Sequence, residues 1–87
     1  MGITRGQLKK LGFKKDEIAL EYIFPNDKSR AFILFKNQDC LLLREHLPDF
    51  TLFKAVVMLD EVGYFEMQRV LQDLSIGLNY EFRNQIS

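Results

Sequence analysis

The sequence predicts a small α+β domain, in which a mostly antiparallel sheet of three to five strands packs with a short N-terminal helix and a C-terminal amphipathic helix. Three observations predict this class: a helix-capping pattern near the start, short apolar segments separated by turn residues, and a later segment with helical spacing. The expected order of elements is α-β-β-β-(β)-α-β. A chain of 87 residues without a linker or an internal repeat is expected to form one domain over residues 1–87.

The first helix is expected over residues 5–11. Thr4 and Gln7 have the spacing of a capping box, in which the Thr4 hydroxyl accepts from the backbone of residue 7 and the Gln7 side chain reaches back. Leu8 would face the core, and Gly12 can adopt the left-handed conformation that ends many helices. Because the helix is short, packing must hold it in place.

Three strands are expected over residues 18–24, 30–36 and 40–46. Apolar and other residues alternate in the first of these segments, and the other two are short and rich in apolar residues. Residues 25–27 and 37–39 contain the Pro, Asn and Asp residues that favour turns. The three segments therefore predict an antiparallel meander.

Residues 51–59 allow two interpretations. The segment contains β-branched residues and has apolar residues on both faces, which favours a central or partner-covered strand. A buried helix over residues 49–60 is the alternative, because periodicity alone does not separate the two in a short apolar run. We favour the strand.

The last two elements are an amphipathic helix over residues 64–76 and a short strand over residues 78–83. Gly63 and Gly77 stand where helix caps are common. The apolar stripe of the helix consists of Met67, Val70, Leu71 and Leu74. Apolar residues alternate in the final segment, which predicts a strand at an edge of the sheet.

The residue types do not suggest enzymatic chemistry. Cys40 and His46 are the only candidates for a nucleophile and its base, and six residues of strand would separate them by about 20 Å. The sequence contains no phosphate-binding loop, nucleophile elbow or metalloprotease motif. We therefore expect a protein that is not an enzyme, with no catalytic residue, metal, cofactor or small-molecule substrate.

The composition favours a cytoplasmic protein. One cysteine can form neither an internal disulfide nor a cysteine-based zinc site, and small secreted domains usually rely on such links. No apolar run approaches the roughly 18–20 residues that a membrane-spanning helix needs. We expect no membrane association.

Charge is distributed unevenly along a chain whose formal net charge is zero. The first 15 residues contain no acid and five bases: Arg5, Lys9, Lys10, Lys14 and Lys15. This segment could be the solvated face of an amphipathic helix, a contact for an acidic protein surface, or a contact for nucleic-acid phosphates. The remaining residues have a net charge of −5, which leaves mimicry of nucleic acid by the acidic part open.

The strands carry more large apolar side chains than two short helices could cover. Either the sheet curls and hides both of its faces, or one face is an interface with a second copy or another protein. The residues that we expect at such an interface are Phe32, Leu34, Leu42, Val56 and Met58, with Lys9, Lys10, Lys14 and Lys15 for charge complementarity.

The expected function is that of a non-catalytic protein–protein interaction module. It could form a homodimer, with pairing of the edge strand over residues 78–83 as one route. It could also be a phage or mobile-element accessory protein, such as an inhibitor of a host defence nuclease. The alternative is a nucleic-acid-binding domain that uses the basic N-terminal segment.

Overall fold

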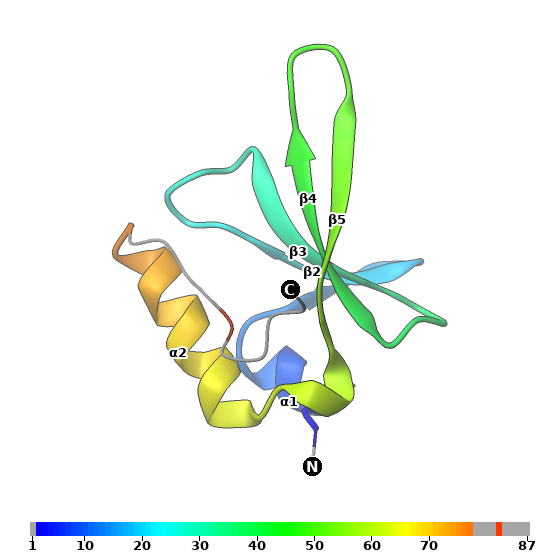
Figure 1. The fold of residues 1–87 in the computed structure, drawn as a ribbon, viewed down its shortest axis with the longest axis vertical. Helices are drawn as coiled ribbons and strands as arrows, with labels where there is room; N and C mark the ends of the chain where they lie inside the picture. Colours follow the sequence, from blue (N-terminus) through cyan, green and yellow to red (C-terminus); the bar gives the residue numbers. More distant parts are fainter. Residues whose placement is uncertain (1, 78–81, 83–87) are drawn as a thin grey trace.

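The computed structural model describes residues 2–77 and residue 82, and within them five antiparallel strands form one sheet in the order β1-β2-β3-β4-β5 (Figure 1). The strands are β1 (Lys14–Lys15), β2 (Ala19–Ile23), β3 (Arg30–Phe35), β4 (Cys40–His46) and β5 (Thr51–Met58). The helices are α1 (Arg5–Lys10), the 3₁₀ helix η1 (Leu59–Glu61) and α2 (Tyr64–Ser75). The predicted α+β class, with a short N-terminal helix and a C-terminal helix, is confirmed.

Differences from the prediction concern single elements. Residues 51–58 form a strand, so the alternative of a helix over residues 49–60 is wrong. The two-residue strand β1 and the helix η1 were not predicted, because segments of two or three residues are too short to show a periodicity. The expected strand over residues 78–83 lies outside the described residues except for Phe82, whose buried ring packs edge-on against Phe32.

The ends of α1 follow the sequence pattern. The Thr4 hydroxyl accepts from the Gln7 amide at 3.1 Å, and the Thr4 amide donates to the Gln7 side-chain oxygen at 3.0 Å, so the predicted capping box is present. Gly12 has a φ of 114°, which few residues other than glycine adopt, and the chain leaves the helix there toward β1.

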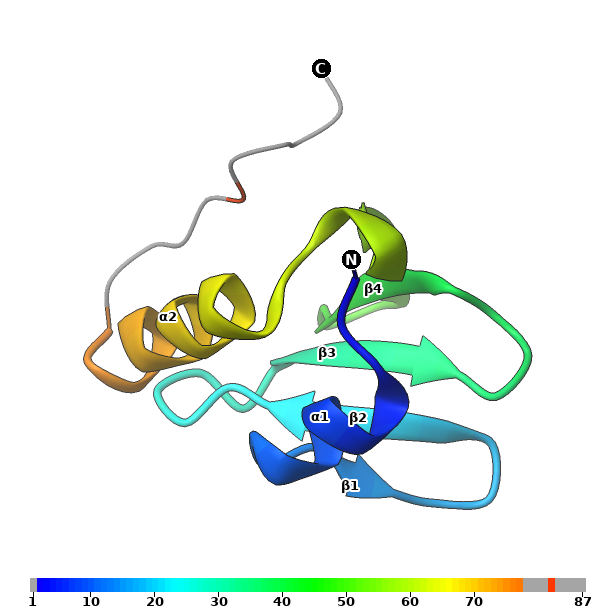
Figure 2. The ribbon, with the colours of Figure 1, turned by 90° about the horizontal axis from the view of Figure 1, so that it is seen from below.

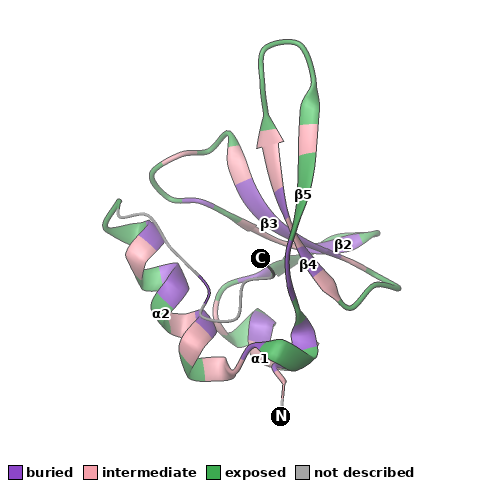
Figure 3. Cartoon of the chain, in the orientation of Figure 1, coloured by how far each residue is buried: buried purple, intermediate pink, exposed green. Residues whose placement is uncertain are grey.

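Both helices cover the same face of the sheet, which we call the helix-covered face (Figures 1 and 2). One core cluster joins Leu8 of α1 and Met67 of α2 to Phe32, Leu34 and Leu41 of the sheet. All five side chains are fully buried, and Figure 3 shows the buried residues of α2 on the side nearer the sheet. In the described part of the chain, no helix is long and apolar enough to cross a membrane.

An irregularity in β5 explains why two consecutive apolar residues of this strand are both buried. Leu41 pairs with Val57 and Leu42 pairs with Ala55, so Val56 has no partner in the register. This is the pattern of a β-bulge, in which one strand contains an extra residue and two neighbouring side chains can point to the same side. Val56 and Val57 are both buried in the main core as a result.

Candidate functional site

The opposite face of the sheet, which we call the open face, is partly covered by its own side chains. Residues directly opposite in an antiparallel pair share a face, and the register therefore places Ala19, Ala31, Ile33 and Phe35 together on it. The first three are buried in a second small apolar cluster, and Phe35 packs against them. The sheet thus buries side chains on both faces.

Two contacts cross the open face diagonally. Arg44 of β4 forms an ion pair with Glu21 of β2, at 2.6 Å between Nη1 and Oε2, and the register places this pair over β3 between Ala31 and Ile33. The small side chain of Ala31 leaves room for the arginine. The pair therefore closes over the second cluster where no helix does.

The second contact is between Phe35 of β3 and Phe53 of β5, whose ring centroids lie 6.0 Å apart. The register places Leu42 of β4 between the two rings, and its side chain is half-buried. Phe53 itself remains 47% exposed, so the covering is incomplete on this side of the sheet.

Four of the eight large apolar side chains that are exposed among the described residues lie on the β4–β5 hairpin. Figure 1 shows this hairpin extending away from the helices and from the other strands. Leu47 and Phe50 in its loop are 40% and 58% exposed, and with Phe53 they form what we call the hairpin patch. The Leu47 amide donates to the Phe50 carbonyl at 2.8 Å, which holds the loop in one shape.

The structure corrects part of the predicted interface. Phe32, Leu34 and Val56 are buried in the main core, so they contact the chain's own helices rather than a partner. The sequence has large apolar residues on both faces of β3, and nothing in it indicates which face the helices cover. Leu42 and Met58 do lie on the open face, half-buried and exposed respectively.

The fold places the five bases of the N-terminal segment in different parts of the surface. Lys9, Lys10 and Lys15 are all exposed, but only Lys9 and Lys15 line a pocket between α1 and the sheet. Lys14 pairs with Glu21 in the register and so lies on the open face. The five bases therefore do not form one continuous surface, and the solvated-face interpretation describes Lys10 best.

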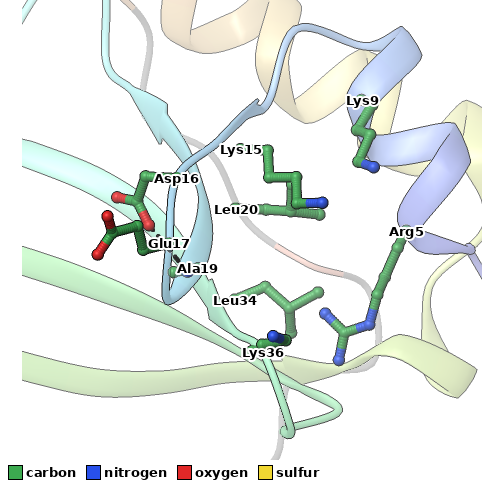
Figure 4. Close-up of a pocket in the computed structure, with 9 residues that line it drawn as sticks. All are labelled: Arg5, Lys9, Lys15, Asp16, Glu17, Ala19, Leu20, Leu34 and Lys36. Carbon is green, nitrogen blue, oxygen red and sulfur yellow. Dashed lines mark hydrogen bonds between the residues drawn. The ribbon is translucent and has the colours of Figure 1, made fainter.

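The pocket has a volume of about 270 Å³. It lies between α1, the β1–β2 turn and the end of β3. Its floor includes the buried side chains of Leu20 and Leu34. Four cations from separate parts of the chain line it: Arg5, Lys9, Lys15 and Lys36 (Figure 4). We call these residues with the floor the basic pocket.

Sequence reasoning missed Lys36. It follows β3 and lies more than 20 residues from the basic N-terminal segment, with no neighbouring base. Antiparallel pairing of β2 with β3 brings it beside the β1–β2 turn, where its amide donates to the Ile18 carbonyl at 2.8 Å. No sequence signal could have found it without the register.

The structure does not bring together the two residues that the sequence offered as a nucleophile and its base. Cys40 and His46 stand at opposite ends of β4, and the His46 ring nitrogen lies 3.0 Å from the Thr51 hydroxyl. No group of three or more His, Cys, Asp or Glu side chains in this part of the chain could hold a metal ion. No family model, curated protein or solved structure matches the chain.

Proposed function

We propose that this chain is a non-catalytic protein-interaction module and that the hairpin patch is the centre of its contact surface. One observation carries the proposal: three large apolar side chains are exposed within seven residues of one projecting hairpin. A single exposed leucine or phenylalanine is common on protein surfaces, but a cluster of them is typical of an interface.

The chemistry of the hairpin patch suits protein binding. Aromatic residues are frequent among the residues that dominate interface energetics, and Phe50 and Phe53 provide two of them. Burying a phenylalanine that is now half exposed gains roughly 25 cal/mol for each Å² of apolar surface removed from water. The loop hydrogen bond limits the ordering that binding would otherwise require.

The neighbouring strand adds a second means of association. β5 is the last strand of the sheet, so in the described part of the chain the backbone groups on its outer side are not paired within the sheet. An edge of eight residues can accept a strand from another chain, and Phe53 and Met58 would flank that strand with apolar surface. A second copy of the chain could add its own β5 in this way.

Light scattering of the purified chain over a wide concentration range, compared with Phe50→Ser, tests the proposal. Phe65→Ser is the matched control, because Phe65 is 79% exposed on α2, away from the hairpin patch. We expect concentration-dependent dimers that Phe50→Ser weakens and Phe65→Ser does not.

If the wild type is monomeric, immobilised wild type and both variants are compared for the proteins that they retain from cells. Selective loss with Phe50→Ser supports a hetero-partner, for which an inhibited host nuclease is one example. Identical retention by all three, together with a monomeric wild type, contradicts the proposal.

A further inference from the structure

We infer that the basic pocket binds a phosphomonoester that is attached to a small apolar body. The inference does not depend on the proposed function, because no residue of the hairpin patch lines the basic pocket. It rests on the convergence of four cations, on the lack of an acidic partner for three of them among the described residues, and on an apolar floor beneath them.

The four cations converge although they are distant in the sequence. Arg5 and Lys9 are one helical turn apart on α1, Lys15 ends β1, and Lys36 follows β3. In Figure 4 the cationic ends of these side chains lie around Leu20 and Leu34. Bringing like charges together costs free energy, and a bound anion would offset that cost.

Three of the four cations have no acidic partner in the described part of the chain. Among those residues, Lys9, Lys15 and Lys36 form no ion pair, while Arg5 lies 3.8 Å from Asp39. The Arg5 guanidinium also donates to the Gln38 carbonyl, which holds it in place. A guanidinium has five donors, so this contact leaves others for a ligand.

The two carboxylates that line the basic pocket are directed elsewhere. Asp16 accepts from the amides of Ile18 and Ala19 at 2.9 Å, and therefore serves the β1–β2 turn. Figure 4 shows the carboxylates of Asp16 and Glu17 on the other side of the view from the cationic ends of Arg5 and Lys9. The cationic side of the pocket thus remains free for an anion.

The size and the floor define the rest of the ligand. A volume of about 270 Å³ is close to the lower end of the roughly 300–1,000 Å³ that small-molecule pockets occupy. This space holds a phosphate and a small ring, but it does not enclose a polymer. Leu20 and Leu34 provide an apolar contact for the ring, and lysine ammonium groups suit a phosphate dianion as point charges.

Phenyl phosphate is the probe, and its binding can be followed by amide chemical shifts in the folded chain. We expect saturable shifts at Lys15, Leu20 and Lys36, and a weaker response to benzoate, which has the same ring but one negative charge. Each of Lys9→Gln and Lys36→Gln should weaken binding by roughly three- to fivefold, in the range of an exposed ion pair.

Lys10→Gln is the matched control, because Lys10 is the exposed neighbour of Lys9 on the same helix and its loss changes the net charge equally. Wild-type affinity in this variant supports the inference. Equal weakening by Lys9→Gln and Lys10→Gln, or shifts spread over exposed lysines outside the pocket, would overturn it.

The source of the phosphate is resolved by a short single-stranded oligonucleotide with and without a 5′-phosphate. Displacement of phenyl phosphate by the phosphorylated form alone would extend the inference to a nucleic-acid end. Tight binding of the unphosphorylated form without any phenyl phosphate binding would replace it with backbone recognition, the nucleic-acid alternative. Light scattering of the Lys9→Gln, Lys10→Gln and Lys36→Gln variants measures self-association separately, so a failure of this inference can be told from a failure of the hairpin patch.

Discussion

The side-chain amide of Asn26 donates a hydrogen bond of 2.8 Å to the main-chain carbonyl of Leu74, 48 residues later in the chain. The same amide donates to the Ser75 carbonyl, also at 2.8 Å. Carbonyls in the last turn of a helix have no partner within the helix. The turn after β2 therefore caps the end of α2 and joins the helix to the sheet.

Asn26→Ala should lower the free energy of unfolding by about 1–2 kcal/mol, because two hydrogen bonds to helix-end carbonyls are lost. Asn26→Asp should cost more, since a carboxylate cannot donate and is repelled by the negative end of the helix. Urea denaturation measures both. Asn37→Ala, in the exposed turn after β3, is the control, and a loss equal to that of Asn26→Ala would contradict the capping role.

The ion pair between Glu21 and Arg44 should contribute more to stability than an ordinary surface pair. Its side chains are only 25% and 20% exposed, whereas in the Glu45–Lys54 pair the lysine is 58% exposed. We expect a coupling energy of about 1–3 kcal/mol for the first pair and below about 1 kcal/mol for the second. Double-mutant cycles with glutamine substitutions measure the two coupling energies. Equal values would show that lower exposure does not strengthen the Glu21–Arg44 pair.

Truncation of Phe32 should cost much more stability than truncation of Phe53, although both are strand phenylalanines. Phe32→Ala removes a fully buried ring and should destabilise the fold by about 3–5 kcal/mol. Phe53→Ala removes a half-exposed ring and should cost within about 1 kcal/mol. Thermal or denaturant unfolding distinguishes them. A large loss with Phe53→Ala would mean that the hairpin patch is needed for folding, which would weaken its assignment to binding.

Alanine should have opposite effects on stability at two glycines near the N-terminus, Gly2 and Gly6. A Cβ on Gly2 would overlap the backbone of Leu59 and Asp60, so Gly2→Ala should destabilise the contact with η1 by about 1–3 kcal/mol. At Gly6 in α1 a Cβ would make only an ordinary contact of 3.9 Å with the Thr4 hydroxyl, so Gly6→Ala should stabilise by about 0.5–1 kcal/mol through helix propensity. Melting temperatures that change in the same direction in both variants would contradict the close approach at Gly2.

Asp27 should contribute to the pH dependence of stability. Hydrogen bonds from the Ser29 hydroxyl, the Arg30 guanidinium and the Ser29 amide hold the pKa of Asp27 below its ordinary value of 3.8. Because the pKa is lower in the folded chain, this stabilisation is complete above the unfolded-state pKa and is lost as the pH falls through the folded-state pKa. An NMR titration of the Asp27 carboxyl measures the shift, and a midpoint at or above 3.8 would contradict it. Asp27→Asn should flatten the acid limb of stability.

The elements with strong local signals could be predicted from the sequence. The capping box at Thr4 and Gln7, the glycine stop at Gly12 and the stripe of α2 all depend on residues within a few positions of one another. The sheet of short strands followed from apolar segments and turn residues in the same way. These features determined the α+β class and the order of the described elements other than β1 and η1.

The tertiary structure decided which side chains are buried and which meet. Phe32 and Phe35 stand three residues apart in one apolar strand, yet only the position of the helices puts the first in the main core and the second on the open face. Likewise Lys36 joins Lys9 and Lys15 only because β2 pairs with β3 in one register. Local sequence patterns record the preferences of the backbone and the spacing of apolar residues, whereas a face, a pocket or a patch is created by contacts between segments that the chain keeps far apart.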